Sequence, residues 1–174
     1  MMHTVDNLFL ATKQWAKLSS TECFSEETCA STNDWAKKEA SQNPRSPALY
    51  IADHQQQGRG RGTNTWINPE KGQALLASWS WRLGAPPQPI TSPLIGLALY
   101  QAAQTAWPSI SWSLKAPNDL YAEDKKIAGL LIEVVQSADN VRIIVGLGFN
   151  ILGHPRDVPT ATHLTSELGL NGPL

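Results

Sequence analysis

The chain has 174 residues, of which 41% are hydrophobic and 17% charged, a balance that excludes an intrinsically disordered or fibrous protein. Lys and Arg number 14 against 15 Asp and Glu, so the formal net charge is −1. This argues against a general nucleic-acid binder, because such proteins depend on excess positive charge. No run reaches the roughly 18 apolar residues of a membrane span, so we expect no membrane association.

The length favours one compact domain with a short arm. We expect a polar, partly helical arm over residues 1–20 and a folded domain over residues 21–174. Two cysteines, Cys23 and Cys29, are too few for a disulfide framework or a zinc site. No basic leader with an apolar run opens the chain. Together these features predict a cytoplasmic protein.

The first predicted elements are a helix, two strands and a longer helix. The first helix begins with Ser31 as its cap and Asp34 three residues later, as in a capping box, and ends at about Ser41. Residues 48–54 and 74–83 have the apolar pattern of strands, and a polar, glycine-rich loop lies between them over residues 55–65. A second helix is expected to run to residue 106, with Ser92 as its cap and proline in its first turn.

The second half of the chain is predicted to be mostly extended. Residues 111–115 form a short strand, a turn follows at residues 117–119, and extended structure resumes at residues 120–121. Residues 127–135 and 141–149 are expected to form an antiparallel hairpin, with its loop over residues 136–140. A last short helix over residues 159–168 would end at Gly169. The order predicts an α+β fold with a mainly antiparallel or mixed β-sheet flanked by helices.

Three segments carry candidate chemistry. The first, Gly58-Arg59-Gly60-Arg61-Gly62, has the glycines and guanidinium groups of an anion cradle, although a mobile basic loop without a ligand would have the same composition. The second places Lys126 directly before the most apolar strand, so its ammonium group can extend along the sheet into a cleft. The third, Gly146-Leu147-Gly148-Phe149-Asn150, has glycines inside a strand, which indicates either tight packing or close approach of a ligand.

The order and spacing of the motifs resemble the biotin–protein ligase family, also called biotin–[acetyl-CoA-carboxylase] ligase. The resemblance covers roughly residues 24–168. It rests on Ser31-Thr32-Asn33, Gln55-Gln56-Gln57-Gly58-Arg59-Gly60-Arg61, Trp66, Pro117-Asn118-Asp119-Leu120-Tyr121, Lys126-Ile127-Ala128-Gly129-Leu130-Leu131-Ile132-Glu133 and Gly146-Leu147-Gly148-Phe149-Asn150.

The resemblance implies a fold shared with lipoate ligases and related to class II aminoacyl-tRNA synthetases. It makes residues 21–174 a catalytic domain and implies that biotin and ATP, with Mg²⁺, form biotinyl-5'-AMP. This adenylate then acylates one lysine of a biotin carboxyl carrier protein. Many relatives form homodimers through an exposed strand edge, so a homodimer is one assembly that the resemblance implies.

The resemblance also assigns residues to roles at the matching positions. No metal ligand is assigned to a protein side chain. Glu133, inside an apolar strand, is expected to pair with the backbone or with a basic group, and a role near the adenylate stays open. Catalysis would involve Lys126, which matches the family's active-site lysine, Arg61, and Asp119 as the group that orients or accepts a proton. Biotin would contact Ser31, Thr32, Asn33, Gln55, Arg59, Gly60, Arg61, Lys126 and Gly129. The nucleotide would contact Arg59, Arg61, Trp66, Asn118, Lys126 and Asn150.

The sequence departs from the family pattern in four respects. The segment after Arg61 carries less positive charge than the family's loop, and Ala116 stands where the family has tryptophan. Residues 1–30 lack a clear helix-turn-helix pattern, so we expect no DNA binding, and we expect no counterpart of the small C-terminal β domain of bacterial members. Two other functions therefore stay open: a biotin-binding module without catalysis, and a lipoate or octanoate transferase on the same fold.

Overall fold

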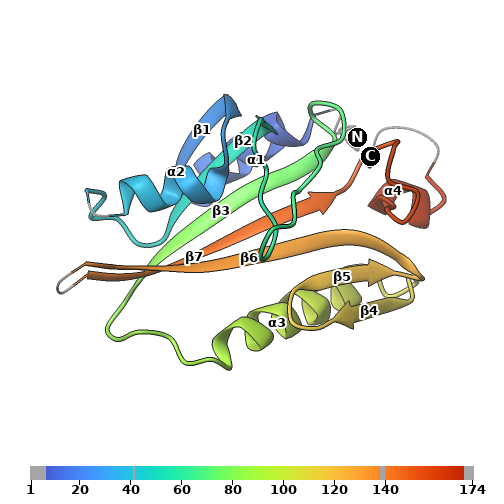
Figure 1. Ribbon diagram of the computed structural model, residues 1–174. Coiled ribbons are helices and arrows are strands. Elements are labelled where there is room, and N and C mark those ends of the chain that lie inside the picture. Colours follow the sequence, from blue (N-terminus) through green and yellow to red (C-terminus); the bar gives the residue numbers. More distant parts are fainter. Residues whose placement is uncertain (1–6, 41, 138–139, 171–174) are drawn as a thin grey trace.

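The computed structural model describes residues 7–40, 42–137 and 140–170, which form one seven-stranded sheet with four helices (Figure 1). The strand order is β1-β2-β3-β7-β6-β5-β4. The pair β1–β2 is parallel and the other neighbouring pairs are antiparallel, so the α+β prediction with a mixed sheet is confirmed. The elements are α1 (Leu8–Leu18), β1 (Glu22–Cys29), α2 (Thr32–Glu39), β2 (Ala48–Gln55), β3 (Ala74–Leu83), α3 (Thr91–Ala106), β4 (Trp112–Lys115), β5 (Asp119–Ala122), β6 (Lys125–Ser137), β7 (Asn140–Asn150) and α4 (Leu164–Glu167).

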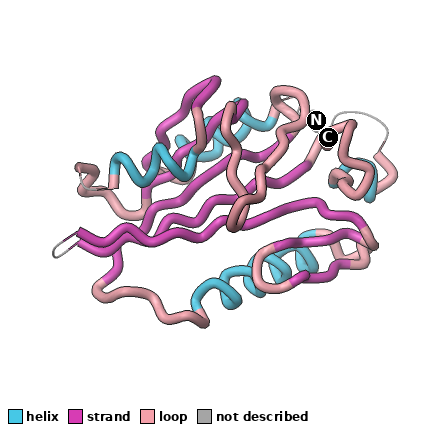
Figure 2. Tube along the Cα trace, in the orientation of Figure 1, coloured by secondary structure: helices cyan, strands magenta, loops and turns pink. Residues whose placement is uncertain are grey.

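The alternation of side chains in β2 places α1 and α2 on opposite faces of the sheet. Successive strand residues point to opposite faces. Leu49 packs in a buried cluster with Phe9 of α1, whereas Tyr50 packs in another cluster with Ala36 of α2. Figure 2 shows the two helices beside the same strands. The face that carries α2 also carries the cavity described below.

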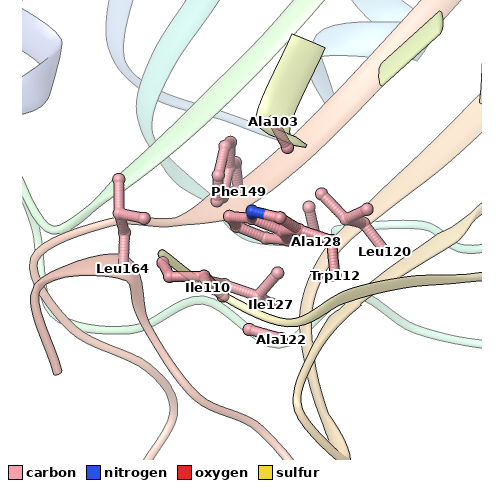
Figure 3. Packing of buried hydrophobic residues seen from close by; sticks show 9 residues of the cluster. All are labelled: Ala103, Ile110, Trp112, Leu120, Ala122, Ile127, Ala128, Phe149 and Leu164. Atoms are coloured by element: carbon pink, nitrogen blue, oxygen red, sulfur yellow. The ribbon is translucent and has the colours of Figure 1, made fainter. Parts of the chain in front are cut away.

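A third cluster joins α3, β4, β5 and the start of β6. It supports the end of β4, the start of β5 and the start of β6, which contribute Lys115, Asp119 and Lys126 to the cavity. Figure 3 shows its side chains converging between these elements. The buried members are Ala103, Ile110, Trp112, Leu120, Ala122, Ile127, Ala128, Phe149 and Leu164.

The predicted strands and the first two predicted helices are found close to their expected bounds, whereas the last helix is only Leu164–Glu167 of the expected 159–168. Of the two predicted caps, Ser31 has the expected position without the capping hydrogen bond, and Ser92 is wrong. Ser31 stands at the N-cap of α2, yet its side chain makes no capping hydrogen bond; it is buried and lines the cavity instead. Ser92 lies inside α3, because Ile90 already has helical dihedral angles and is the N-cap. Gly169 does end the last helical turn, with a φ of 67° that suits glycine.

Two elements near the N-terminus go beyond the sequence prediction. Strand β1 was not predicted, and it pairs with β2 at the edge of the sheet. Helix α1 falls in the expected arm, and its Phe9 and Ala16 are buried against β2 and β3. The division between arm and domain at residue 20 stays a prediction. Residues 1–6 and 171–174, the expected helix end at Ser41 and hairpin-loop residues 138–139 lie outside the described residues. None of the described helices is long and apolar enough to cross a membrane.

Candidate functional site

A cavity of about 350 Å³ lies on the sheet face that carries α2. In Figure 1 the β2–β3 loop runs across β3 and β7 towards β6, and part of this loop forms one wall. The cavity is lined by residues 31–33, residue 55 with residues 59–62 and 64–66, residues 115–119, residue 126 with residues 129–131, and residues 146–148.

The structure brings nearly all of the predicted site residues together around this cavity. Trp66, Asn118 and Asp119 line it. Asn150 does not: it is buried, and its amide nitrogen donates to the Thr162 carbonyl. The residues predicted to contact biotin all line the cavity: Ser31, Thr32, Asn33, Gln55, Arg59, Gly60, Arg61, Lys126 and Gly129.

A buried network of polar side chains includes three residues that line the cavity, Thr32, Asn33 and Gln55. Gln55 Oε1 accepts hydrogen bonds from the backbone nitrogen and the hydroxyl of Thr32, at 2.8 and 3.2 Å. Ser78 Oγ lies 2.8 Å from Thr32 Oγ1 and 2.6 Å from Asn33 Oδ1. Because Gln55 Oε1 already accepts two hydrogen bonds, its amide nitrogen is the group left to meet a ligand. Sequence reasoning missed Ser78; its only signal was a hydroxyl inside an apolar strand.

The glycines inside β7 make room for two side chains of the site, so the tight packing expected around them is confirmed. A Cβ atom on Gly146 would lie 2.1 Å from Asn33 Oδ1. A Cβ atom on Gly148 would lie 2.5 Å from Cε2 of the Trp66 ring. Gly129, opposite Gly148 in the neighbouring strand, also lies under this ring. These glycines therefore let Asn33 and Trp66 approach the sheet closely.

Lys126 and Asp119, which both line the cavity, form an ion pair with Nζ and Oδ1 2.9 Å apart. The Asn118 side-chain amide also donates to Asp119 Oδ1, at 3.1 Å. The backbone of Lys126 is held by Thr160 and Thr162, through hydrogen bonds of 2.9 Å each. The segment held by Asn150 thus supports the strand that carries Lys126. This ammonium and Arg61 are two of the four cationic side chains that line the cavity, together with Arg59 and Lys115.

Arg59 lines the cavity, and its guanidinium group is held by two carboxylates that do not line it. Its guanidinium forms a hydrogen-bonded ion pair with Glu133 and lies 3.0 Å from Asp34 Oδ1. Lys37 Nζ lies 2.9 Å from one oxygen of each of the same two carboxylates. The hydrogen bond to Glu133 raises the pKa of Arg59 above its ordinary value. The expected pairing of Glu133 with a basic group is confirmed.

The environment of Glu133 keeps its carboxylate ionised. Burial alone would raise its pKa, but hydrogen bonds from Arg59, Asn33 and Lys37 outweigh burial and lower the pKa below its usual range. The Asn33 amide donates to Glu133 at 2.9 Å, so the carboxylate also touches the polar network of the cavity. Its connection to the loop was not predicted, because nothing in the sequence relates β6 to Arg59.

Comparison with known proteins shows the family of the chain. The family model of the Biotin/lipoate A/B protein ligase family matches residues 25–150, well over half of the chain. The chain is 32% identical over 151 residues to the bifunctional ligase/repressor BirA of Bacillus subtilis, covering 82% of this chain and 46% of that protein. It is 30% identical over 182 residues to biotin–[acetyl-CoA-carboxylase] ligase of Mycobacterium tuberculosis, covering 97% of this chain and 62% of that protein.

The structure is also similar to solved ligases. Biotin protein ligase from Aquifex aeolicus, in complex with biotin and ATP, matches with a TM-score of 0.66 and 29% identity, over 85% of this chain and 61% of that chain. The chain thus spans about half to three fifths of the length of these relatives. Their sequence likeness and shared fold lead to one conclusion: the chain belongs to the biotin/lipoate A/B protein ligase family.

Proposed function

We propose that this protein activates biotin with ATP to biotinyl-5'-AMP and transfers biotin to a lysine of a biotin carboxyl carrier protein. One observation carries the proposal: Arg61, Lys126 and the uncharged polar network of Thr32, Asn33 and Gln55 surround the same cavity. A ureido ring needs uncharged donors and acceptors, and a carboxylate approaching phosphates needs cations. The Aquifex aeolicus relative, which binds biotin and ATP, supports this combination.

In the first step the biotin carboxylate attacks the α-phosphorus of ATP. A C–O–P linkage forms, and the bond to pyrophosphate breaks. Two unit charges ~4 Å apart repel each other by about 4 kcal/mol at an effective dielectric of 20. Arg61 and Lys126 offset this repulsion and stabilise the charge that develops on the phosphoryl oxygens. The loop with Trp66 restricts access of water to the adenylate.

In the second step the carrier lysine attacks the carbonyl carbon of the adenylate. An amide bond forms and AMP leaves, while the attacking amine loses a proton. Asp119 is proposed to orient the amine or accept this proton. Its Oδ1 already accepts from Lys126 and Asn118, so Oδ2 is the oxygen left for the carrier lysine.

Mg²⁺ is proposed to arrive with ATP. Among the described residues that line the cavity, Asp119 supplies the carboxylate, and the described chain holds no group of three or more potential ligands. This fits Mg²⁺, which commonly binds one or two carboxylates together with substrate phosphates. The ion would neutralise phosphate charge.

The function is tested by incubating purified protein with labelled biotin, Mg-ATP and a biotin carrier domain. We expect ATP-dependent label on the carrier, together with pyrophosphate release. Binding of biotin without dependence on ATP, and without transfer, would instead support a non-catalytic biotin-binding module. Competition by lipoate or octanoate, with transfer of either acid, would support the lipoate transferase alternative. A folded protein that does none of these contradicts the proposal.

The partners remain proposals as well. The carrier is proposed to be the biotin carboxyl carrier protein of acetyl-CoA carboxylase or a similar enzyme, in line with the name of the Mycobacterium tuberculosis relative. A homodimer, a cytoplasmic location and the expected lack of DNA binding stay predictions. Sedimentation at several protein concentrations tests the homodimer.

Replacing Ser78 with Ala tests the polar network. The change leaves Thr32 Oγ1 and Asn33 Oδ1 without the Ser78 hydroxyl, so we expect biotin affinity to fall by about tenfold, the factor for one lost buried hydrogen bond. Calorimetry with biotin measures this change. Ser80→Ala is the matched control, because Ser80 is equally buried on the same strand face but contacts Arg142 instead. Equal biotin affinities of the two variants would contradict the role of Ser78.

A further inference from the structure

The segment from Gly58 to Trp66 is a small hairpin within the β2–β3 loop. The Trp66 amide donates to the Gly58 carbonyl at 2.9 Å, and the Gly60 amide donates to the Asn64 carbonyl at 2.8 Å. Arg59 pairs with Thr65 as an isolated bridge. These contacts fold the glycine-rich segment back on itself.

Two side chains attach this hairpin to the rest of the protein. The Trp66 ring lies on Gly148 and Gly129, while Arg59 reaches Glu133 of β6 and Asp34 of α2. In Figure 1 the loop crosses the sheet towards β6, in agreement with this contact. Because Arg59 and Arg61 are separated by one glycine, the position of Arg61 depends on where Arg59 is held.

The charges around Arg59 balance. Two carboxylates, Asp34 and Glu133, face two cations, Lys37 and Arg59. The Glu133 side chain is 23% exposed against 42% for Asp34, so solvent screens its attraction less. If Glu133 loses its charge, two cations compete for Asp34 alone. Glu133 is therefore the carboxylate on which the attachment of the hairpin depends most.

We propose that Glu133 is a positioning residue that holds the hairpin over the cavity through Arg59. Glu133 does not line the cavity and touches no substrate there. Through Arg59 it keeps Arg61 and Trp66 in place, so retention of the acyl-adenylate depends on it. The role of Glu133 in retaining the adenylate rests on the proposed function, whereas its role in attaching the hairpin does not.

Trypsin cleavage of the ligand-free protein tests the attachment independently of any activity. The isosteric change Glu133→Gln should speed cleavage after Arg59 and Arg61 several-fold, because an exposed, loosened loop is a preferred site of proteolysis. Fragments ending at these residues are quantified by mass spectrometry, and cleavage at other Lys and Arg residues should keep the parent rate. Glu70→Gln is the matched control, since Glu70 pairs with Arg156 at 2.7 Å on the exposed surface. Unchanged cleavage in Glu133→Gln overturns the proposal.

Leakage of biotinyl-5'-AMP tests the functional consequence. Enzyme loaded with biotin and Mg-ATP is passed through a desalting column, and free adenylate is followed over time. We expect leakage to rise about tenfold in Glu133→Gln, as for loss of one hydrogen bond to a charged group, with Glu133→Asp closer to the parent. The double variant with Arg59→Ala should leak no faster than Arg59→Ala alone, because both changes break one contact.

The outcomes separate the two proposals. Additive effects of the two changes, or parental leakage in Glu133→Gln, would overturn the role in adenylate retention. If the parent forms no adenylate at all, the proposed function fails, and the trypsin experiment still decides whether Glu133 holds the hairpin. Melting temperatures of the variants show whether faster cleavage reflects the loop or the whole fold.

Discussion

Replacing Lys126 with Ala is expected to reduce formation of biotinyl-5'-AMP by at least about a hundredfold, and by as much as a thousandfold. This is the range for removing one group that stabilises developing charge in a site shielded from water. The change removes one of the cations that line the cavity and leaves Asp119 without its ion-pair partner. ATP–pyrophosphate exchange in the presence of biotin measures the loss.

Lys125→Ala is the matched control for this experiment. Lys125 precedes Lys126 directly, is exposed and does not line the cavity. We expect its exchange rate to match that of the parent. Because the Lys126 side chain is 35% exposed, its removal should leave the melting temperature nearly unchanged. A Lys126→Ala protein that keeps a tenth or more of the parental exchange rate would exclude this ammonium from the chemistry.

Replacing Gly146 with Ala is expected to damage both the stability of the protein and its affinity for biotin. The added Cβ would lie 2.1 Å from Asn33 Oδ1. Asn33 cannot move aside freely, because it is 3% exposed and hydrogen-bonded to Ser78, Glu133 and the Leu131 carbonyl. Overpacking of this kind typically costs about 1–3 kcal/mol. For a chain of this size, each kcal/mol lowers the melting temperature by about 2–4 °C.

Gly84→Ala separates this local clash from the general effect of replacing a glycine. A Cβ atom on Gly84 would meet nothing within 4 Å, and its φ is not positive. We expect this control to keep the parental melting temperature and biotin affinity. Gly146→Ala should bind biotin at least about tenfold more weakly, since the displaced Asn33 loses its hydrogen bonds. If both variants melt and bind biotin like the parent, Asn33 is not held as tightly as its contacts indicate.

Local pattern in the sequence was enough to predict most of the sheet. Strands β2 and β3 could be predicted because strands buried on both faces carry long apolar runs. Strand β3 has the predicted bounds, and β2 extends one residue beyond its prediction. Strand β1 was missed, since its central residues Ser25, Glu26, Glu27 and Thr28 lack an apolar pattern and it is held by pairing with β2. Ser31 stands at the expected N-cap but makes no capping hydrogen bond, because local spacing cannot show that this residue lines a cavity.

The sequence by itself determined the candidate chemistry, because the family motifs could be matched residue by residue, and nearly all of these residues line the cavity. Tertiary structure decided how they act together. The adjacent strands β3, β7 and β6 place Ser78 and Glu133 on the face of the sheet that carries the cavity. Ser78 thereby meets Asn33, 45 residues away in the chain, and Glu133 meets Arg59, 74 residues away. Such contacts depend on strand order and register, which are set by long-range pairing of the whole sheet and leave no local pattern in the chain.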